Sequence, residues 1–170
     1  MSNSIFDMKP ISRSKRNHGL EHATINVLSK KHPAVSLGGM SSPMGYTIVG
    51  NVTTEDVAEA AIEALKRLRA GESHLVMHPN CGTNFAVSGA AAGLAAWLGT
   101  LGTEKKIQRK LERLPLIILL ATLALILVRP LGPLVQQRFT TSGDPGNLEL
   151  DRVETLVRGG VRMHRVYTRG

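Results

Sequence analysis

The pentapeptide His18-Gly19-Leu20-Glu21-His22 lies near the start of the stretch NHGLEHATINVLSKK, residues 17–31, which predicts the first helix of the fold. Asn17 is a favourable N-cap residue for such a helix. The helix should end close to Lys31 because Pro33 disfavours helical geometry in the residue before it. The preceding residues 1–16 are polar and basic and predict a flexible lead.

The pentapeptide also predicts a metal site. On a helix, His18 and His22 lie one turn apart on one face, with the Glu21 carboxylate beside them. Two neutral imidazoles can bind one divalent ion, and the carboxylate would take a proton from a metal-bound water or orient a ligand. The alternative is that both histidines are ordinary members of an amphipathic helix. Gly19 lowers helix propensity by about 1 kcal/mol, which indicates that some group approaches the backbone beside the two histidines.

A second cluster, His78-Pro79-Asn80-Cys81-Gly82-Thr83, offers further ligands. Cys81 is the only cysteine, so the chain cannot form an intramolecular disulfide. Either Cys81 or His78 could complete the site, and a thiolate with two imidazoles suits zinc better than magnesium or calcium. The alternative is that Cys81 is a small buried apolar residue at the start of a helix.

Hydrophobic patterning predicts the α+β class, with a small α-β-β-α-β layer over residues 17–82 as the metal-site domain. Short strands are expected at residues 35–37 and 46–49 around Gly- and Pro-rich turn signals. A second helix should begin at Thr53 or Thr54, and residues 74–78 read as the last strand.

The layer should be followed by a membrane helical hairpin over residues 83–135. Residues 114–128 are uncharged and flanked by arginines, which favours a bilayer, although fifteen residues reach only about 22 Å as a helix. A buried core helix is the alternative. The preceding segment contains Gly89 and Gly93, a small-xxx-small spacing that allows close helix approach and a homo-oligomer through this helix.

The remaining residues 136–170 predict a C-terminal tail with an amphipathic surface helix from about residue 147 to 157. His32 and His164 are expected at the surface. Glu63 and Arg67 have the i, i+4 spacing of an ordinary helical ion pair.

Composition limits the partners. The 170 residues carry a net charge of +8 but only one Trp, two Tyr and three Phe, so we exclude nucleic acid as a partner for lack of stacking residues. Basic residues beside an apolar segment indicate a lipid bilayer instead. No cleavable signal peptide is recognised at the N-terminus, so we expect a bacterial cell-membrane protein with its soluble part in the cytoplasm.

Three ordered blocks resemble a YqhQ-like bacterial membrane family of unknown function, described as predicted metal-dependent enzymes. The blocks are residues 18–22, residues 78–83 and the run PLVQQRFTT at residues 133–141. The stretch 35–72 makes this chain look like a shorter relative of that family. The pentapeptide is also locally similar to inverted zincins, in which a downstream glutamate completes the metal shell. Here Glu72 is the nearest candidate for that role.

Three functions remain open at this point. The first is a membrane-anchored, zinc-dependent hydrolase of the peptidase kind, acting on a membrane-proximal peptide or protein, with His18, His22 and either Cys81 or His78 as ligands and Glu21 as general base. The second is a non-catalytic scaffold in which all four ligands close the site. The third is an enzyme with a Cys81 nucleophile activated by a histidine.

Overall fold

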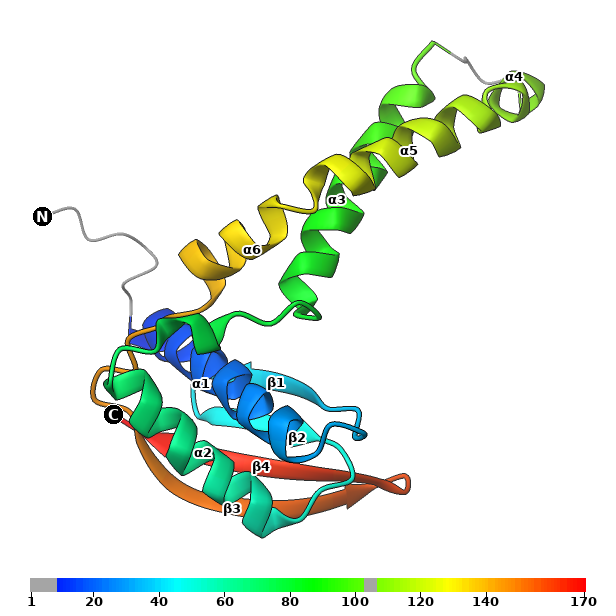
Figure 1. Cartoon of the computed structure of the whole chain (residues 1–170). Helices are drawn as coiled ribbons and strands as arrows, with labels where there is room; N and C mark the ends of the chain where they lie inside the picture. The colour runs from blue at the N-terminus through cyan, green and yellow to red at the C-terminus, as the bar shows by residue number, and fades with distance from the viewer. Residues whose placement is uncertain (1–8, 103–106) are drawn as a thin grey trace, which may run out of the picture. The chain divides into compact units, whose positions relative to one another are not determined.

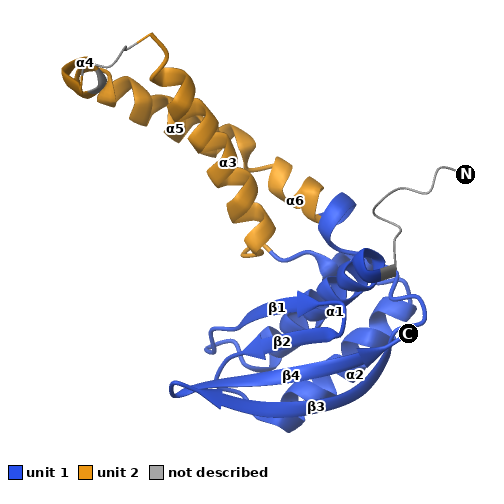
Figure 2. Cartoon of the chain, turned by 180° about the vertical axis from the view of Figure 1, so that it is seen from behind, with its two compact units in different colours: residues 1–78, 137–170 blue, residues 79–136 orange. Residues whose placement is uncertain are grey.

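A computed structural model describes residues 9–102 and 107–170 of the chain. These residues form two compact units, coloured separately in Figure 2. Unit 1 contains the chain up to His78 and again from Gln137 onward, whereas unit 2 contains the intervening residues 79–136. Two segments that are far apart in the sequence therefore fold together in unit 1.

Unit 1 is an antiparallel sheet of four strands in the order β1-β2-β4-β3, with helices α1 and α2 against one face (Figure 1). In chain order its elements are α1 (Lys9–Lys31), β1 (Gly38–Ser42), β2 (Gly45–Val49), α2 (Thr54–Arg69), the 3₁₀ turn η2 (Ser73–Val76), the π-helical turn η3 (Gln136–Thr140) at the junction with unit 2, β3 (Glu149–Arg158) and β4 (Val161–Arg169). The structure is thus mixed α+β, as the sequence predicts.

The core of unit 1 lies between the sheet and the two helices. Alternate residues of the central strands face the helices and are fully buried, as Tyr46 and Ile48 on β2 and Val166 on β4 illustrate. Leu20 and Leu28 of α1 are buried against them. Helix α2 is confirmed as predicted, with an N-cap at Thr53 and a buried apolar face.

The start of the first helix differs from the prediction. Helix α1 already includes Lys9, so residues 9–16 are helical and not a flexible lead, while residues 1–8 lie outside the described part. Asn17 is not an N-cap but a fully buried residue. Its Nδ2 donates to the carbonyl oxygens of Ser42 and Pro43 at 2.8 and 3.2 Å, and its Oδ1 accepts from Thr168. The side chain of Asn17 therefore hydrogen-bonds to distant parts of unit 1 and does not cap the helix.

Two predicted strands are also wrong. Residues 35–37 form no strand, because the chain pairs one step later: Gly38 lies opposite Val49 and Ser42 opposite Gly45. The second strand is confirmed as β2, but most of the predicted turn between the strands is β1 itself, and only residues 43 and 44 form the turn. Residues 74–78 form no strand either, since η2 and an extended segment occupy this place beside α1. The α-β-β-α-β order therefore fails at its last element.

The prediction of a C-terminal amphipathic helix is wrong, and the physical reason is a pair of adjacent glycines. Gly159 and Gly160 have φ angles of +57° and +77°, which suit a tight two-residue turn between antiparallel strands. The flanking runs accordingly form β3 and β4, and β4 pairs with β2 in the centre of the sheet. His164, expected at the surface, is fully buried on β4.

Unit 2 is helical and contains α3 (Gly82–Gly99), α4 (Ile107–Glu112), α5 (Leu114–Val128) and α6 (Leu131–Val135). Helices α3 and α5 lie side by side, and they pack closely at Gly99, where an added Cβ would lie 2.9 Å from Cγ1 of Ile117. Gly89 and Gly93 have no such neighbour in the described chain. The predicted small-residue spacing is therefore not what brings α3 and α5 together.

The described helices fall short of membrane spans in length or in hydropathy. None of them alone is both long and apolar enough to cross a bilayer. The helical segments Leu114–Val128 and Leu131–Thr140 meet the criterion only as a pair, and the chain bends by 52° between them.

Candidate metal centre

The two histidines of the pentapeptide lie together on α1. The ring centroids of His18 and His22 are 4.3 Å apart, with the ring planes at 64°. His22 is only 2% exposed, and His18 is partly buried. The i, i+4 spacing therefore produces the shared face that the sequence predicts.

Each of these rings is held by a backbone carbonyl. Nδ1 of His18 lies 2.9 Å from the carbonyl oxygen of Thr140, and Nδ1 of His22 lies 2.7 Å from that of Val76. A carbonyl oxygen can only accept, so Nδ1 must be the protonated nitrogen in both rings. Each neutral ring then has its lone pair on Nε2, the usual arrangement of a metal-binding histidine whose other nitrogen is held by an acceptor.

The end of η2 and the residue that follows it are fixed to α1 by three successive carbonyls. Besides the Val76 carbonyl bound by His22, the carbonyl oxygens of Leu75 and Met77 accept from Nδ2 of Asn26 at 2.7 and 3.2 Å. This holds the chain just before His78, whose ring centroid is 5.6 Å from that of His22. Asn26 is a residue that the sequence analysis missed, because an asparagine in a helix carries no motif.

Cys81 follows three residues after His78, so its Cα lies within about 11 Å of the Cα of His78 in any conformation of the chain. It is the N-cap residue of α3, its side chain makes no capping hydrogen bond, and it is 5% exposed. A helix N-terminus favours the thiolate, the form that binds metals.

One group of residues in the described part of the chain has the proximity that a metal ion requires. The ligand atoms of His18, His22 and Cys81 all lie within 4.8 Å of one another. His78 is not a member of this group. The structure thus offers two imidazoles and a thiol, the donor set expected for zinc.

Glu21 lies on the side of α1 that faces the sheet. It is 3% exposed, and its carboxylate lies against the backbone of Gly39 on β1. Burial raises the pKa of the neighbouring Tyr46, its hydrogen bond to Thr24 lowers it, and the charge of Glu21 raises it further. Glu72, the other acidic candidate, is bound by Arg67, with 2.6 Å between its Oε2 and Nη2 of the arginine, so it has a structural role.

The absence of a side chain at Gly19 lets another part of the chain approach α1 closely, as the sequence predicts. A Cβ at this position would overlap with the carbonyl oxygen of Ser142. The amide of Ser142 in turn donates to the carbonyl of Lys15 at 3.1 Å. This close approach brings Thr140 beside His18, so the glycine indirectly positions one of the two imidazoles.

The fold and the site together define an α+β protein with a candidate His/His/Cys metal centre, whose two histidines lie on its first helix. The chain belongs to the family described as a domain of unknown function, DUF6391, whose model matches residues 13–153. It is also similar to an uncharacterized protein from Picosynechococcus sp. (strain ATCC 27264 / PCC 7002 / PR-6), with 34% identity over 158 residues, covering 82% of this chain and 71% of that protein. No solved structure matches the chain. A family of unknown function is therefore confirmed.

Proposed function

We propose that this chain is a zinc-dependent hydrolase with His18, His22 and Cys81 as metal ligands. The observation that carries the proposal is the pair of bonds from Nδ1 to the carbonyls of Thr140 and Val76. These bonds leave Nε2 of both rings for a metal, as in most histidine ligands, whose other nitrogen donates to a carbonyl or carboxylate. Cys81, within 4.8 Å of both, completes a set of three ligands. Three protein ligands leave one coordination position for substrate or water, as in catalytic zinc sites.

The chemistry proposed is hydrolysis of a peptide or another acyl bond. Bound zinc would lower the pKa of a water to about 7 and polarise the substrate carbonyl. Glu21 would act as the general base, because it lies three residues after His18 on α1 and residues at this spacing are neighbours on a helix. The carboxylate is buried against Gly39 of β1 in the structure, so this proposal requires it to turn toward the metal-bound water during the reaction.

A closed structural site is the second candidate, and the position of His78 favours it. Its ring centroid is 5.6 Å from that of His22, so a small rotation of the side chain could add a fourth ligand. Four protein ligands would exclude substrate from the metal and make the centre a scaffold. A Cys81 nucleophile is the third candidate, supported by the position of this thiol at the start of α3.

Metal analysis of the purified full chain is the first test. Inductively coupled plasma mass spectrometry should find about one zinc per chain, lost in His22→Ala and in Cys81→Ala. His74→Ala is the matched control because His74 is exposed on η2. Folded wild-type protein without a transition metal would reject both metal-dependent functions and leave the thiol nucleophile.

X-ray absorption at the zinc edge then distinguishes the catalytic from the structural site. The proposal expects one sulfur, two imidazoles and one further light ligand that exchanges with added anions. Substituting Glu21→Gln should keep the metal but abolish hydrolysis of a membrane-proximal peptide. A spectrum with three imidazoles and one sulfur, changed by His78→Ala, would identify the structural site instead.

Membrane anchoring in a bacterial cell is part of the same proposal. The apolar pair of segments over residues 114–140 is long enough to span when taken together. A cysteine ligand remains reduced in the cytoplasm, which favours that side for Cys81 and the metal it would bind. A homo-oligomer could form through the open face of α3 at Gly89 and Gly93. Relationships to the YqhQ-like family and to inverted zincins belong to this proposal as well.

A further inference from the structure

A cavity of about 650 Å³ lies beside the N-terminal half of α1, on unit 1 alone. Two arginines of the helix, Arg13 and Arg16, line it together with Pro43 of the β1–β2 turn and Asn147 of the loop before β3. Residues three apart on a helix are neighbours, so the two guanidinium groups reach the cavity from the same side of α1. The side chains that line the cavity, which also includes Pro10, Ser12 and Gly170, therefore carry two positive charges.

The two arginines are positioned by neutral acceptors. Nη2 of Arg13 donates to the carbonyl oxygen of Thr168 at 3.1 Å, and Nη1 of Arg16 donates to Oδ1 of Asn147 at 3.0 Å. A guanidinium has five N–H donors, so these bonds leave most of them available. Nε of Arg13 is buried and has no acceptor within the described residues. Neither arginine forms an ion pair in that part of the chain.

The loop beside Arg16 strengthens this arrangement. Gly146 has a φ of +54°, and a Cβ there would lie 2.8 Å from Cζ of Arg16, so the loop backbone lies directly against the guanidinium. Asp144, the acidic residue of this loop, accepts a hydrogen bond from the Gly146 amide at 2.8 Å. The loop therefore fixes the arginine while its own carboxylate is used to shape the turn.

We propose that this cavity binds a phosphate monoester. Such a group carries a charge of about −1.5 to −2 and three acceptor oxygens, which match two fixed guanidinium groups. The volume lies within the range of about 300–1,000 Å³ typical of small-molecule sites and is large for a bare inorganic ion. This volume leaves room for an organic body beside the phosphate, and the ester would be carried either by a soluble metabolite or by a lipid headgroup.

This site is independent of the metal centre. Arg13 and His18 are five residues apart, which separates their directions by about 140° around the helix axis. The arginines face the strand ends, where Thr168 lies, whereas the histidines face η2 and η3. Loss of zinc should therefore leave the binding of phosphate esters unchanged.

The test is calorimetric titration of the detergent-purified full chain with glycerol 3-phosphate, with glycerol as the uncharged control. A second arm measures binding to nanodiscs that contain phosphatidic acid or phosphatidylcholine alone. Saturable binding in the first arm identifies a soluble ester, and binding restricted to phosphatidic acid identifies a lipid headgroup. Absence of binding in both arms would overturn the proposal.

Substitutions locate the binding. Arg16→Gln and Arg13→Gln should each weaken it at least tenfold, whereas Lys15→Gln, with the same charge change on the same helix, should alter it less than twofold. Because Arg13 also bonds to Thr168, Arg13→Lys serves as a second variant that keeps the charge but loses the planar fork, and it should also weaken binding. An equal loss in Lys15→Gln would show nonspecific charge attraction and contradict the site.

Discussion

Gly39 of β1 lies against the Glu21 carboxylate of α1 so closely that a methyl group at position 39 would overlap with it. We therefore expect Gly39→Ala to displace Glu21. Because Glu21 is only 3% exposed, the strand or the carboxylate must move, and overpacking of this kind lowers the free energy of unfolding by about 1–3 kcal/mol. Hydrolytic activity should fall while zinc content stays unchanged.

The neighbouring glycine provides a matched control. A Cβ at Gly38 would meet no atom within 4 Å, and Gly38 belongs to the same edge strand. Gly38→Ala should therefore leave both chemical denaturation and activity close to those of the wild type. Equal effects of the two substitutions would show that β1 tolerates no side chain at all and that Glu21 is not the reason.

Substitution of Asn26 should lower zinc affinity. Its Nδ2 holds the carbonyls of Leu75 and Met77, so Asn26→Asp replaces a donor with an acceptor that repels both. The segment carrying His78 and Cys81 should loosen, and zinc affinity should fall about tenfold, as is usual for residues that support metal ligands. Competition with a chromophoric chelator measures this. Asn51→Asp, at an exposed position, is the control and should keep wild-type affinity.

The sequence predicts the helices and the paired histidines better than the sheet. An i, i+4 pair depends only on local helix geometry, so the contact between His18 and His22 follows directly from their spacing. The strand register cannot be inferred in this way. The turn at Gly159 and Gly160 is a local signal for a hairpin, but residues 147–157 before it also fit the helical period, and this pattern predicts a helix there.

The hydrogen bonds that hold the two imidazoles join residues that are far apart in the sequence. Thr140 lies 122 residues after His18, and Val76 lies 54 residues after His22. Nothing in the local pattern of either segment indicates which carbonyl will face a ring. Gly19 was the one informative signal, because a glycine in the middle of a helix requires a reason. It indicated a close approach without identifying Ser142 as the group that approaches.

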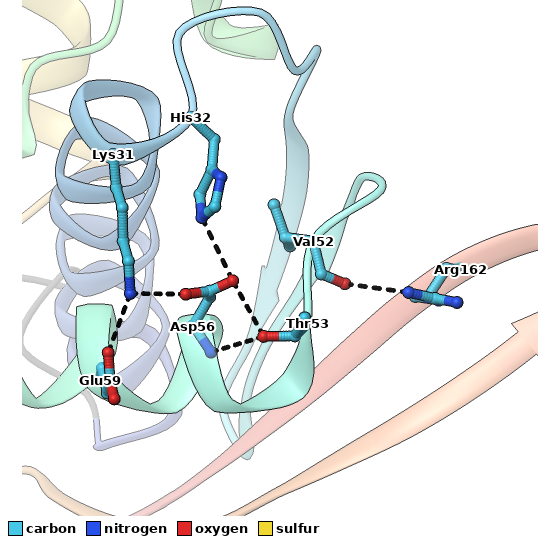
Figure 3. A network of polar contacts seen from close by, with 7 residues as sticks. All are labelled: Lys31, His32, Val52, Thr53, Asp56, Glu59 and Arg162. Atoms are coloured by element: carbon cyan, nitrogen blue, oxygen red, sulfur yellow. Dashed lines mark hydrogen bonds and ion pairs between the residues drawn. The ribbon is translucent and has the colours of Figure 1, made fainter.

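The network in Figure 3 predicts acid sensitivity. Asp56 at the start of α2 lies 2.5 Å from Nζ of Lys31 and 3.2 Å from Nε2 of His32, and its pKa is lowered to about 2, mainly by the bond to Lys31 and then by Thr53. Because the pKa of Asp56 is lower in the folded chain, the ionised carboxylate stabilises the fold at pH values above its ordinary pKa of 3.8. This stabilisation is lost as the pH falls toward 2.

Asp56→Asn should therefore reduce the dependence of thermal stability on pH between about 4 and 2. Differential scanning calorimetry at several pH values in this range measures the effect. Glu55→Gln, one residue earlier in the same helix turn, is the control and should keep the wild-type slope. An unchanged slope in Asp56→Asn would place the acid-sensitive group elsewhere.

Buried His164 predicts a second pH effect in a different range. Burial lowers its pKa below the ordinary 6.5, and the charge of Arg162 lowers it further, whereas the Val52 backbone and Glu55 act in the opposite direction. Below pH 6.5 the unfolded chain binds a proton that the folded chain does not, so stability falls as the pH falls. His164→Gln should show a smaller loss of stability between pH 7.5 and 5.5 than the wild type in urea denaturation. Exposed His74→Gln should behave like the wild type.

Gly19 gives the most direct test of how the fold positions the metal centre. In an open helix, Gly19→Ala would stabilise by up to about 1 kcal/mol, because alanine has the higher helix propensity. Here the new methyl would overlap with the carbonyl of Ser142, so the segment around residues 140–142 must move away from α1. The carbonyl of Thr140 would then lose Nδ1 of His18.

We therefore expect Gly19→Ala to lower both the free energy of unfolding and the zinc affinity. Gly89→Ala on α3 is the matched helical control, because a Cβ there meets no atom within 4 Å. It should leave zinc affinity unchanged and should not lower stability. A Gly19→Ala protein that binds zinc as tightly as the wild type would show that the bond to Thr140 does not orient His18, and the metal proposal would then rest on His22 and Cys81 alone.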